Sequence, residues 1–408
     1  MTREKVEPTQ MSSGMVMLFA MATALSVANL YYIQPLLRSV EQTFHVGSVS
    51  TGLVVTYTQI GYVCGLVLLV PLGDLLDRRK LIVSLLAVGF AGLILAGLSE
   101  SLTWLSATVA VVGMSSVVAQ ILVPFAATLA SEAERGKVVG TVMSGLLVGI
   151  LLARTFSGLV AGVAGWRSIY FVAAALMVLL GLVLWRKLPS AEPAEKVRYS
   201  KLLRSVLEIF LTEPVLRLRS AYGAASFAMF SILWTSLAFL LAGPDYRFSN
   251  SVIGLFGLAG AGGAVAASFA GRSVDSGRET GATMVSIVSA TVGFGLLFAA
   301  RQHLWAVIAG IVILDIGCQG LHVTNQAIIY RIRPEARSRI TTAYMVTFFV
   351  GGTIGSAASA AIYGAYGWAG VCILGTSVGF LTLLAWLTGQ VQTIRSGRTD
   401  SSNSFSVR

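Results

Sequence analysis

Long apolar runs recur along almost the whole length of this 408-residue chain. Each run has roughly 20 residues, the length that an α-helix needs to cross the hydrocarbon core of a bilayer. The runs are continuous rather than alternating between apolar and polar residues, so they favour helices over the strands of a membrane barrel. Only 12% of the residues are charged, about half the share of a soluble chain. The chain is therefore predicted to be a polytopic membrane protein.

We predict an all-α membrane protein with twelve transmembrane helices in two pseudo-symmetric six-helix bundles. The predicted spans cover residues 14–37, 48–71, 81–99, 103–130, 137–164, 168–187, 216–242, 250–270, 280–300, 303–330, 340–364 and 368–391. The predicted organisation has an N-terminal tail (1–13), a first bundle (14–187), a central loop (188–215), a second bundle (216–391) and a C-terminal tail (392–408).

Lysine and arginine fix the predicted orientation. If the N-terminus lies in the cytoplasm, 24 of the 29 basic residues fall in cytoplasmic segments. Positive charge accumulates on the cytoplasmic side of membrane proteins. We therefore predict a multi-pass protein of the inner (cytoplasmic) cell membrane with both termini in the cytoplasm. The same bias explains the net charge of +11 without a nucleic-acid partner.

The two halves of the chain repeat one another. Gly73 and Asp77 after the second span match Gly271 and Asp275 after the eighth. Further matches pair Arg135, Met143, Gly149, Gly165 and Trp166 with Arg337, Met345, Gly351, Gly367 and Trp368. Two successive repeats of six spans keep the same orientation. This pattern is typical of transporters that place a binding site between two rocking halves.

Two polar loops at corresponding places are predicted to form a cytoplasmic gate motif. Its residues are Gly73, Asp74, Asp77, Arg78, Arg79 and Lys80 after the second span, and Gly271, Asp275 and Arg278 after the eighth. Glycine permits a tight exit from the preceding helix, and aspartate can cap the next helix or pair with arginine. Such ion pairs would hold one state of the two halves and break in the other. The alternative is that the basic loops only anchor the chain.

These features resemble the major facilitator superfamily over nearly the whole chain. The resemblance rests on "GDLLDRRK" (73–80), its weaker copy "GRSVDSGR" (271–278), the six-plus-six layout and "GWR" (165–167). Two further segments, "ANLYYIQPLL" (28–37) and "ILLARTFSGLVAGVAGWR" (150–167), are similar to the bacterial proton-antiporter branch that includes drug and sugar efflux permeases. The resemblance implies that spans 1, 4, 7 and 10 line a central cavity.

Three ionisable side chains are predicted to lie deep in the membrane, namely Arg154, Asp315 and His322. An isolated charge at the bilayer centre costs about 2.5–3.5 kcal/mol, so such groups normally face a bundle interior or water. The acid and the imidazole share one face of the tenth span with Gln319 and Gln326, all within roughly 60° on a helical wheel. We expect this polar stripe to face a wet cavity rather than lipid.

Asp315 and His322 are the candidates for proton coupling, because a carboxylic acid and an imidazole can each be tuned to change charge near neutral pH. The candidates for the substrate cavity are Asn29, Tyr32, Gln120, Arg154, Trp234, Gln319, Asn325 and Gln326. The alternative for the stripe is interhelical hydrogen bonding alone. Arg154 has three alternatives: a pair with Asp315, a contact to a substrate anion, or a side chain extended toward the outer surface.

The predicted function is secondary active transport of a small organic solute by alternating access, in the form of proton-coupled efflux. The alternatives are a uniporter or proton-linked importer and, in another class, a membrane-embedded sensor. The sequence has no metal-ligand spacing and no Walker-type loop. We therefore predict no enzyme activity, no metal and no cofactor. The predicted partners are a small-molecule substrate, protons and membrane lipid, and the protein is predicted to be a monomer.

Overall fold

The computed structural model describes residues 11–190, 198–260, 263, 273, 276–299, 303–333 and 336–404, with side chains described as far as residue 389. The regular structure of these residues is helical. The all-α fold that the sequence predicts is therefore confirmed.

The first half of the chain folds into helices that cover most of residues 13–187. They are α1 (Ser13–Ala28), η1 (Gln34–Leu36), α2 (Leu37–Phe44), α3 (Ser48–Leu68), η2 (Val70–Asp74), α4 (Arg78–Gly97), α5 (Leu102–Ser115), α6 (Val118–Leu129), α7 (Arg135–Ala164) and α8 (Ser168–Lys187). Serine or aspartate caps three of them, since Ser12, Asp77 and Ser101 accept hydrogen bonds from backbone N–H groups in the first turns of α1, α4 and α5.

The second half begins after a helix that the sequence does not predict, because α9 lies inside the predicted central loop. The elements are α9 (Tyr199–Thr212), α10 (Pro214–Ala242), α11 (Asn250–Leu255), η3 (Phe256–Gly260), α13 (Glu279–Phe298), α14 (Leu304–Ile329) and α15 (Arg337–Ser404). Gly367 interrupts α15 with φ 62° and ψ −157°, a conformation that glycine adopts without steric cost. The last two predicted spans are thus the two arms of α15.

Two predicted spans are broken in the structure. The first ends as a helix at Ala28 and continues through turns into η1, which contains Pro35. Span 103–130 is divided into α5 and α6, where Ser115 and Ser116 both donate side-chain hydrogen bonds to the carbonyl of Val112, at 2.9 and 2.7 Å. Such local bonds compete with the helical backbone ladder.

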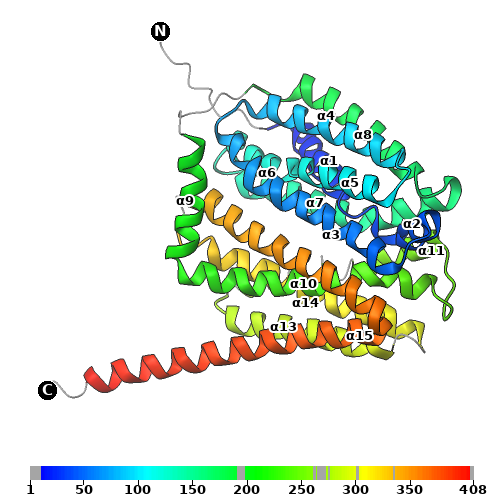
Figure 1. Cartoon of the computed structure of the whole chain (residues 1–408). Coiled ribbons are helices and arrows are strands. Elements are labelled where there is room, and N and C mark those ends of the chain that lie inside the picture. Colours follow the sequence, from blue (N-terminus) through cyan, green and yellow to red (C-terminus); the bar gives the residue numbers. More distant parts are fainter. Residues whose placement is uncertain are drawn as a thin grey trace, which may run out of the picture.

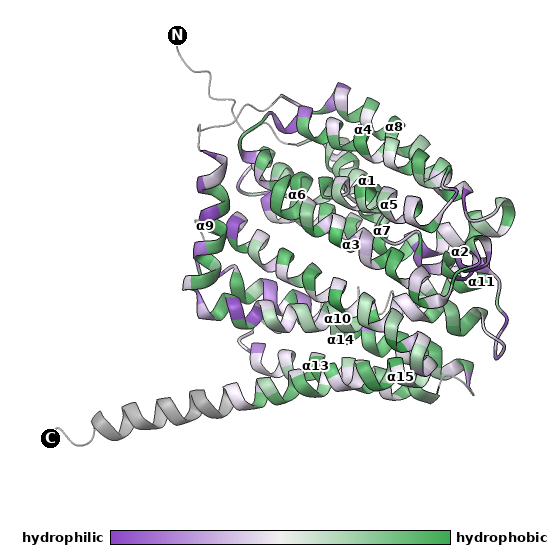
Figure 2. Cartoon of the chain, in the orientation of Figure 1, coloured by the Kyte–Doolittle hydropathy of each residue, from purple (hydrophilic) through white to green (hydrophobic). Residues whose placement is uncertain are grey.

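The described residues include nine helices that are long and apolar enough to cross a membrane. One of them, the 53-residue stretch Arg337–Gly389, holds two predicted spans. Ser13–Ala28 and Asn250–Gly260 are apolar but shorter. Figure 2 shows hydrophobic residues along the helices, with hydrophilic residues concentrated near the ends of the bundle. The membrane character is therefore confirmed, whereas the number twelve stays a prediction.

The helices form two groups that lie side by side (Figure 1). The first-half group contains α1 and α3 to α8, and the second-half group contains α10, α13, α14 and α15. One end of the molecule carries α9 and the last turns of α15, and the opposite end carries α2 and α11. We call these the α9 end and the α2 end. The two groups meet where α3 packs against α15 and where α7 packs against α11.

Polar contacts close the two halves against each other toward the α2 end. The hydroxyls of Thr56 on α3 and Ser356 on α15 lie 2.8 Å apart. Asn250 of α11 donates to the hydroxyl of Ser39 on α2 at 2.7 Å. Each pair joins residues from different halves, so separation of the halves at this end requires these bonds to break.

The two halves also repeat one close helix contact. Glycines spaced four residues apart lie against the backbone of a neighbouring helix, α1 in the first half and α10 in the second. The contacts join Gly145 to Ala20, Gly149 to Ala24, Gly351 to Ala224 and Gly355 to Ala228. Small residues permit this close approach of two membrane helices. The shared contact supports the pseudo-symmetry that the sequence repeats predict.

Candidate functional site: a central cavity

A cavity of about 510 Å³ lies between the two halves and reaches the α9 end of the molecule. Its walls come from α1, α3, α6 and α7 on one side and from α10, α14 and α15 on the other. Residues at its mouth include Asp74, Arg78, Leu202, Val206, Arg337 and Arg339. The mouth is therefore charged and opens beside α9, while the α2 end carries the contacts that close the halves.

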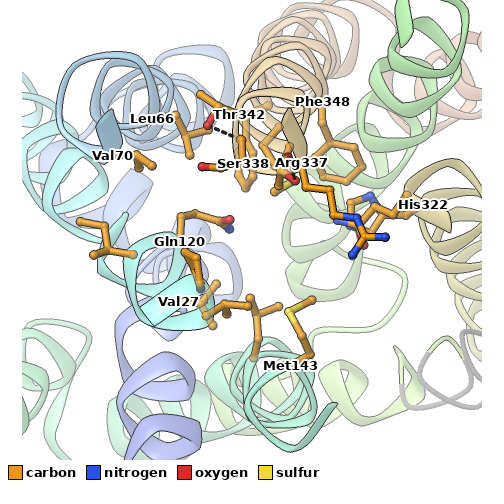
Figure 3. Close-up of a pocket in the computed structure, with 18 of the residues that line it drawn as sticks. Val27, Leu66, Val70, Gln120, Met143, His322, Arg337, Ser338, Thr342 and Phe348 are labelled. Atoms are coloured by element: carbon orange, nitrogen blue, oxygen red, sulfur yellow. Dashed lines mark hydrogen bonds between the residues drawn. The ribbon is translucent and has the colours of Figure 1, made fainter. Parts of the chain in front are cut away.

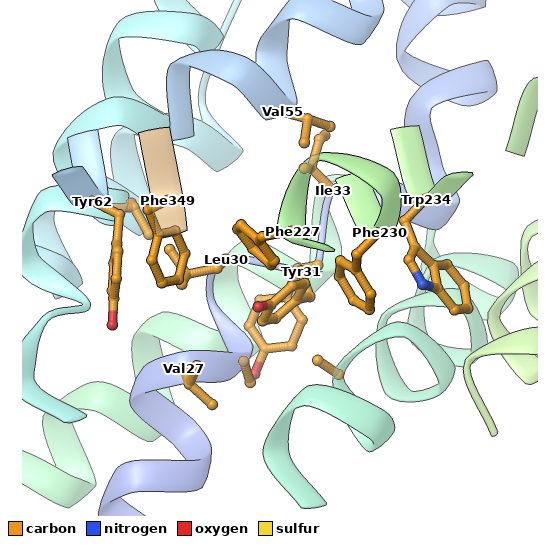
Figure 4. Close-up of a cluster of buried hydrophobic side chains, with 14 of the residues drawn as sticks. Val27, Leu30, Tyr31, Ile33, Val55, Tyr62, Phe227, Phe230, Trp234 and Phe349 are labelled. Carbon is orange, nitrogen blue, oxygen red and sulfur yellow. The ribbon is translucent and has the colours of Figure 1, made fainter. Parts of the chain in front are cut away.

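Aromatic rings from both halves form much of the cavity wall (Figure 4). Phe227 of α10 stacks on Phe348 of α15 with ring centroids 4.3 Å apart. Tyr62 of α3 lies 4.2 Å from the ring of Phe349 on α15. Such a surface suits a solute with an apolar body, and the polar side chains described below then fix its orientation.

The polar stripe of α14 faces the cavity in part. Gln319, His322 and Gln326 line it. The Nδ1 atom of His322 lies 3.0 Å from the hydroxyl of Tyr344, and its ring lies 4.4 Å from that of Phe348. The imidazole is thus held by α15 at the cavity wall.

Gln120 reaches the cavity from the opposite side (Figure 3). It lies on α6 and donates a hydrogen bond to the hydroxyl of Tyr62 at 3.1 Å. Gln120 and His322 are the residues that the sequence repeat places at matching positions of spans 4 and 10. The structure brings them to facing walls of one cavity, one from each half.

Arg154 lies beneath the deep end of the cavity and is 2% exposed. Its Nε donates to Oε1 of Gln34 at 2.6 Å, and its Nη1 donates to the carbonyl of Ile150 at 3.3 Å. The guanidinium carbon lies 3.8 Å from the ring centroid of Trp234 on α10. Attraction between the cation and this ring offsets part of the desolvation of the buried charge. The arginine thus extends from the first half into an aromatic slot of the second.

Asp315 lies on α14, one turn beyond Gln319, and is 4% exposed. It does not line the cavity. Its Oδ2 lies so close to η3 that a β-carbon at Gly260 would come within 2.6 Å of it. Its charge interacts with that of Arg154, although no ion pair described in the structure joins the two side chains. Arg154 and Asp315 are the only charged side chains that are buried among the described residues.

Besides Arg154, four predicted cavity residues lie outside the cavity lining. Asn29 points toward α8, where its Nδ2 lies 3.6 Å from the sulfur of Met177. Tyr32 is buried, and its carbonyl accepts a hydrogen bond from Ser157 of α7. Asn325 is fully buried outside the lining, and Trp234 lies on Arg154 rather than at the cavity surface.

Tyr31 lines the cavity beside Phe230 of α10, although it is not among the cavity residues predicted from the sequence. Its ring and that of Phe230 have centroids 6.4 Å apart at 86° (Figure 4). A continuous helix through residues 14–37 would give Asn29 and Tyr32 the same phase. Tyr31 instead lies one helical turn after Val27, which also lines the cavity.

The loop after α3 forms a network within the first half. Arg78 donates to the carbonyl of Gly73 at 3.0 Å and forms an ion pair with Asp74 at 3.2 Å. Asp77 caps α4, and Arg79 lies 4.6 Å from the ring of Trp185 on α8. These contacts therefore stay on one side of the cavity mouth.

The remaining motif residues are exposed or lie outside the described residues. Lys80 is exposed. In the second copy, Gly271 and Asp275 lie outside the described residues, and Arg278 is exposed at the start of α13.

Comparison with known proteins identifies the family to which this chain belongs. The model of the Major Facilitator Superfamily matches residues 19–300 and, in a second overlapping match, residues 226–403. The chain belongs to the major facilitator superfamily. It is accordingly a multi-pass membrane transporter that carries a small solute, and not an enzyme.

Relatives of this superfamily member agree with the assignment. The chain is 47% identical over 380 residues to the "Uncharacterized transporter YgaY" of Escherichia coli O157:H7, a match that covers 93% of this chain and 96% of YgaY. Two solved structures share the fold. A bacterial homologue of the human lysosomal transporter Spinster, in an inward-facing and occupied conformation, has a TM-score of 0.72 at 14% identity and covers 92% of this chain and 94% of that one. The nucleoside transporter NupG has a TM-score of 0.71 at 13% identity, with coverage of 91% and 99%.

Proposed function

We propose that this transporter couples the movement of a small organic solute to protons by alternating access, with Asp315 as the proton-binding group. The observation that carries the proposal is the position of this acid. It is the one buried carboxylate among the described residues, and it lies where α14 of the second half approaches Arg154 of the first. A carboxylate at such a junction can bind a proton in one state of the two halves and release it in the other.

The proposed orientation of the chain in the membrane indicates which side of the membrane the cavity faces. The α9 end carries most of the lysine and arginine residues, so by the positive-inside rule it faces the cytoplasm. The cavity then opens to the cytoplasm, and the contacts at the α2 end form the outer gate. Bacterial relatives support the inner membrane as the location. Because the cavity is complete within one chain, we propose that a monomer surrounded by lipid is the working unit.

His322 is the proposed second member of the proton path. It lies two turns from Asp315 on the same helix and lines the cavity, whereas Asp315 is covered. Its hydrogen-bonding contact with Tyr344 orients the ring. An imidazole at the cavity surface can pass a proton between water and a covered acid. Gln120, Gln319 and Gln326 would then contact polar groups of the solute.

The predicted direction is efflux in exchange for protons, which the similarity of spans 1 and 5 to the antiporter branch supports. Proton-linked uptake is a second candidate, and one observation favours it. Arg154 and Asp315 supply one positive and one negative charge to the deep site. If a proton neutralises Asp315, a solute that restores the balance would travel with the proton rather than against it.

Transport in proteoliposomes tests the proposal. The purified protein would face an imposed pH gradient of either sign, with labelled arabinose, ethidium and benzoate as test solutes and an internal dye that reports proton movement. We expect one solute to move uphill in wild-type vesicles. Asp315→Asn should abolish this uphill movement and leave downhill exchange measurable. Glu100→Gln, at an exposed acid between α4 and α5, is the matched control. Uphill movement at the wild-type rate in Asp315→Asn would contradict the coupling role.

A further inference from the structure

We infer that Arg154 is a binding site for the anionic group of the solute, and that the transported solute is therefore an organic anion with an apolar body. This inference rests on the proposed function, because it specifies the solute of the same cavity. The starting observation is a buried N–H donor that has no hydrogen-bond partner. The Nη2 of Arg154 is buried and has no hydrogen-bond partner, while Nε and Nη1 of the same side chain are both bonded.

A merely structural arginine would be expected to satisfy its donors. Leaving a buried charged donor unpaired costs stability, so native proteins rarely retain one without a role. Here Gln34 and the carbonyl of Ile150 hold the guanidinium in place, and Trp234 stacks on its face. The remaining N–H groups are fixed in direction. A planar guanidinium with free N–H groups matches the geometry of a carboxylate.

Two side chains that line the cavity lie next to this group. Tyr31 and Phe230 line the cavity, and the guanidinium carbon of Arg154 lies 4.8 and 5.2 Å from their ring centroids. The two rings thus form the floor of the cavity and the roof of the arginine site. Figure 4 shows them side by side with Trp234. Rotation of an aromatic side chain is a small motion compared with the rocking of the two halves.

The surroundings define the chemical class of the ligand. Above the floor, Phe227, Phe348 and Phe349 offer ring faces to an apolar body. Below it, Arg154 offers positive charge. A cationic solute would meet that charge in a medium where charges are poorly screened, and this repulsion disfavours it. A monocarboxylate with an aromatic or aliphatic body matches both parts of the site.

The charge balance of the deep site links binding of the anion to binding of the proton. With Asp315 ionised and no anion bound, the deep site holds one positive and one negative charge. With Asp315 protonated, an anion on Arg154 restores the same balance. An anion beside an ionised Asp315 would place two negative charges against one positive charge. Proton and anion should therefore favour each other's binding, as in the proton-linked uptake that is the second candidate for the direction of transport, and by linkage the effect is reciprocal.

Calorimetric titration of the full-length protein in lipid nanodiscs tests the inference. The probes are benzoate and benzamide, which share a ring and differ in charge. We expect wild-type protein to bind benzoate and not benzamide, more tightly at about pH 6 than at about pH 7.5. Arg154→Gln should abolish benzoate binding, and Arg154→Lys should retain part of it. Asp315→Asn should bind benzoate at least about fivefold tighter at the higher pH and lose the pH dependence.

The possible results separate this inference from the proposed function. If wild-type protein does not bind benzoate, or if Arg154→Gln binds it as well as wild type, the anion site is wrong. The gain in affinity of Asp315→Asn keeps the test informative even if Arg154→Gln fails to fold. An unchanged affinity in Asp315→Asn also contradicts the inference. Proton-driven transport of another solute, lost in Asp315→Asn, would leave the proposed function standing without the anion site.

Discussion

The outer gate provides a prediction that can be worked out from the packing of two glycines. Gly254 of α11 and Gly158 of α7 lie against each other across the two halves, and Thr155 donates to the Gly254 carbonyl at 3.0 Å. A β-carbon at Gly254 would lie 2.7 Å from the Arg154 carbonyl oxygen and 3.0 Å from the α-carbon of Gly158. Both neighbours are backbone atoms, so neither can move aside alone. Gly254→Leu should therefore prevent α7 and α11 from closing.

The size of the effect follows from the cost of overpacking. Extra groups forced into a packed interface cost about 1–3 kcal/mol. Because the open gate has no such clash, the ratio of closed to open outer gate should fall by about 5- to 150-fold. The α9 end should close in the same molecules, since the two halves rock as rigid bodies.

Distances between spin labels would measure this shift. Gln42 on α2 and Ser249 before α11 are exposed on different halves, and labels at these positions span the outer gate. We expect Gly254→Leu to lengthen the distance between them relative to wild type. Gly281→Leu is the matched control, because a β-carbon at Gly281 meets no atom within 4 Å. A distance distribution for Gly254→Leu identical to that of wild type would refute the argument from packing.

Two further predictions concern stability. Asp77→Ala should lower the thermal unfolding midpoint, because it removes the side-chain acceptor of the Arg79 backbone N–H at the start of α4. Such a helix cap is worth about 1 kcal/mol. Asp77→Asn should retain most of the stability. Trp234→Leu should lower the midpoint more, because it removes the ring whose centroid lies 3.8 Å from the Arg154 guanidinium carbon. Such a cation–π contact is worth about 2 kcal/mol when desolvated. Trp234→Phe should recover part of the loss. Equal midpoints for Ala and Asn, or for Leu and Phe, would contradict these assignments.

Much of the architecture is predictable from the sequence because the bilayer imposes a strong constraint. Helices must satisfy their own backbone groups in lipid, so apolar runs report their positions directly. The predicted spans differ from the structure where a helix is interrupted within an apolar run. Ser115 and Ser116 break the helix between α5 and α6, and α1 ends at Ala28, before the predicted end of the first span at residue 37. Neither interruption alters the hydropathy of the segment, so a hydropathy pattern cannot reveal it.

The charged residues buried in the membrane show a second limit of prediction from the sequence. A census of ionisable residues identifies Arg154 and Asp315 without any structure, because such residues are rare in membrane spans. It does not reveal that Trp234 covers the arginine, since these residues lie on different helices of different halves. The contact between Gly158 and Gly254 is hidden for the same reason. Helical periodicity describes one helix at a time, whereas these contacts depend on how the halves dock.

The most direct test of the account is the number of protons that cross the membrane with each solute molecule. Proteoliposomes that carry wild-type protein or Asp315→Asn would receive the transported solute with no imposed gradient, and solute and proton fluxes would be recorded together. We expect a fixed ratio of proton flux to solute flux in wild type, in opposite directions for efflux and in the same direction for uptake, and solute movement without protons in Asp315→Asn. Equal proton fluxes per solute in the two proteins would contradict the assignment of Asp315 as the coupling group.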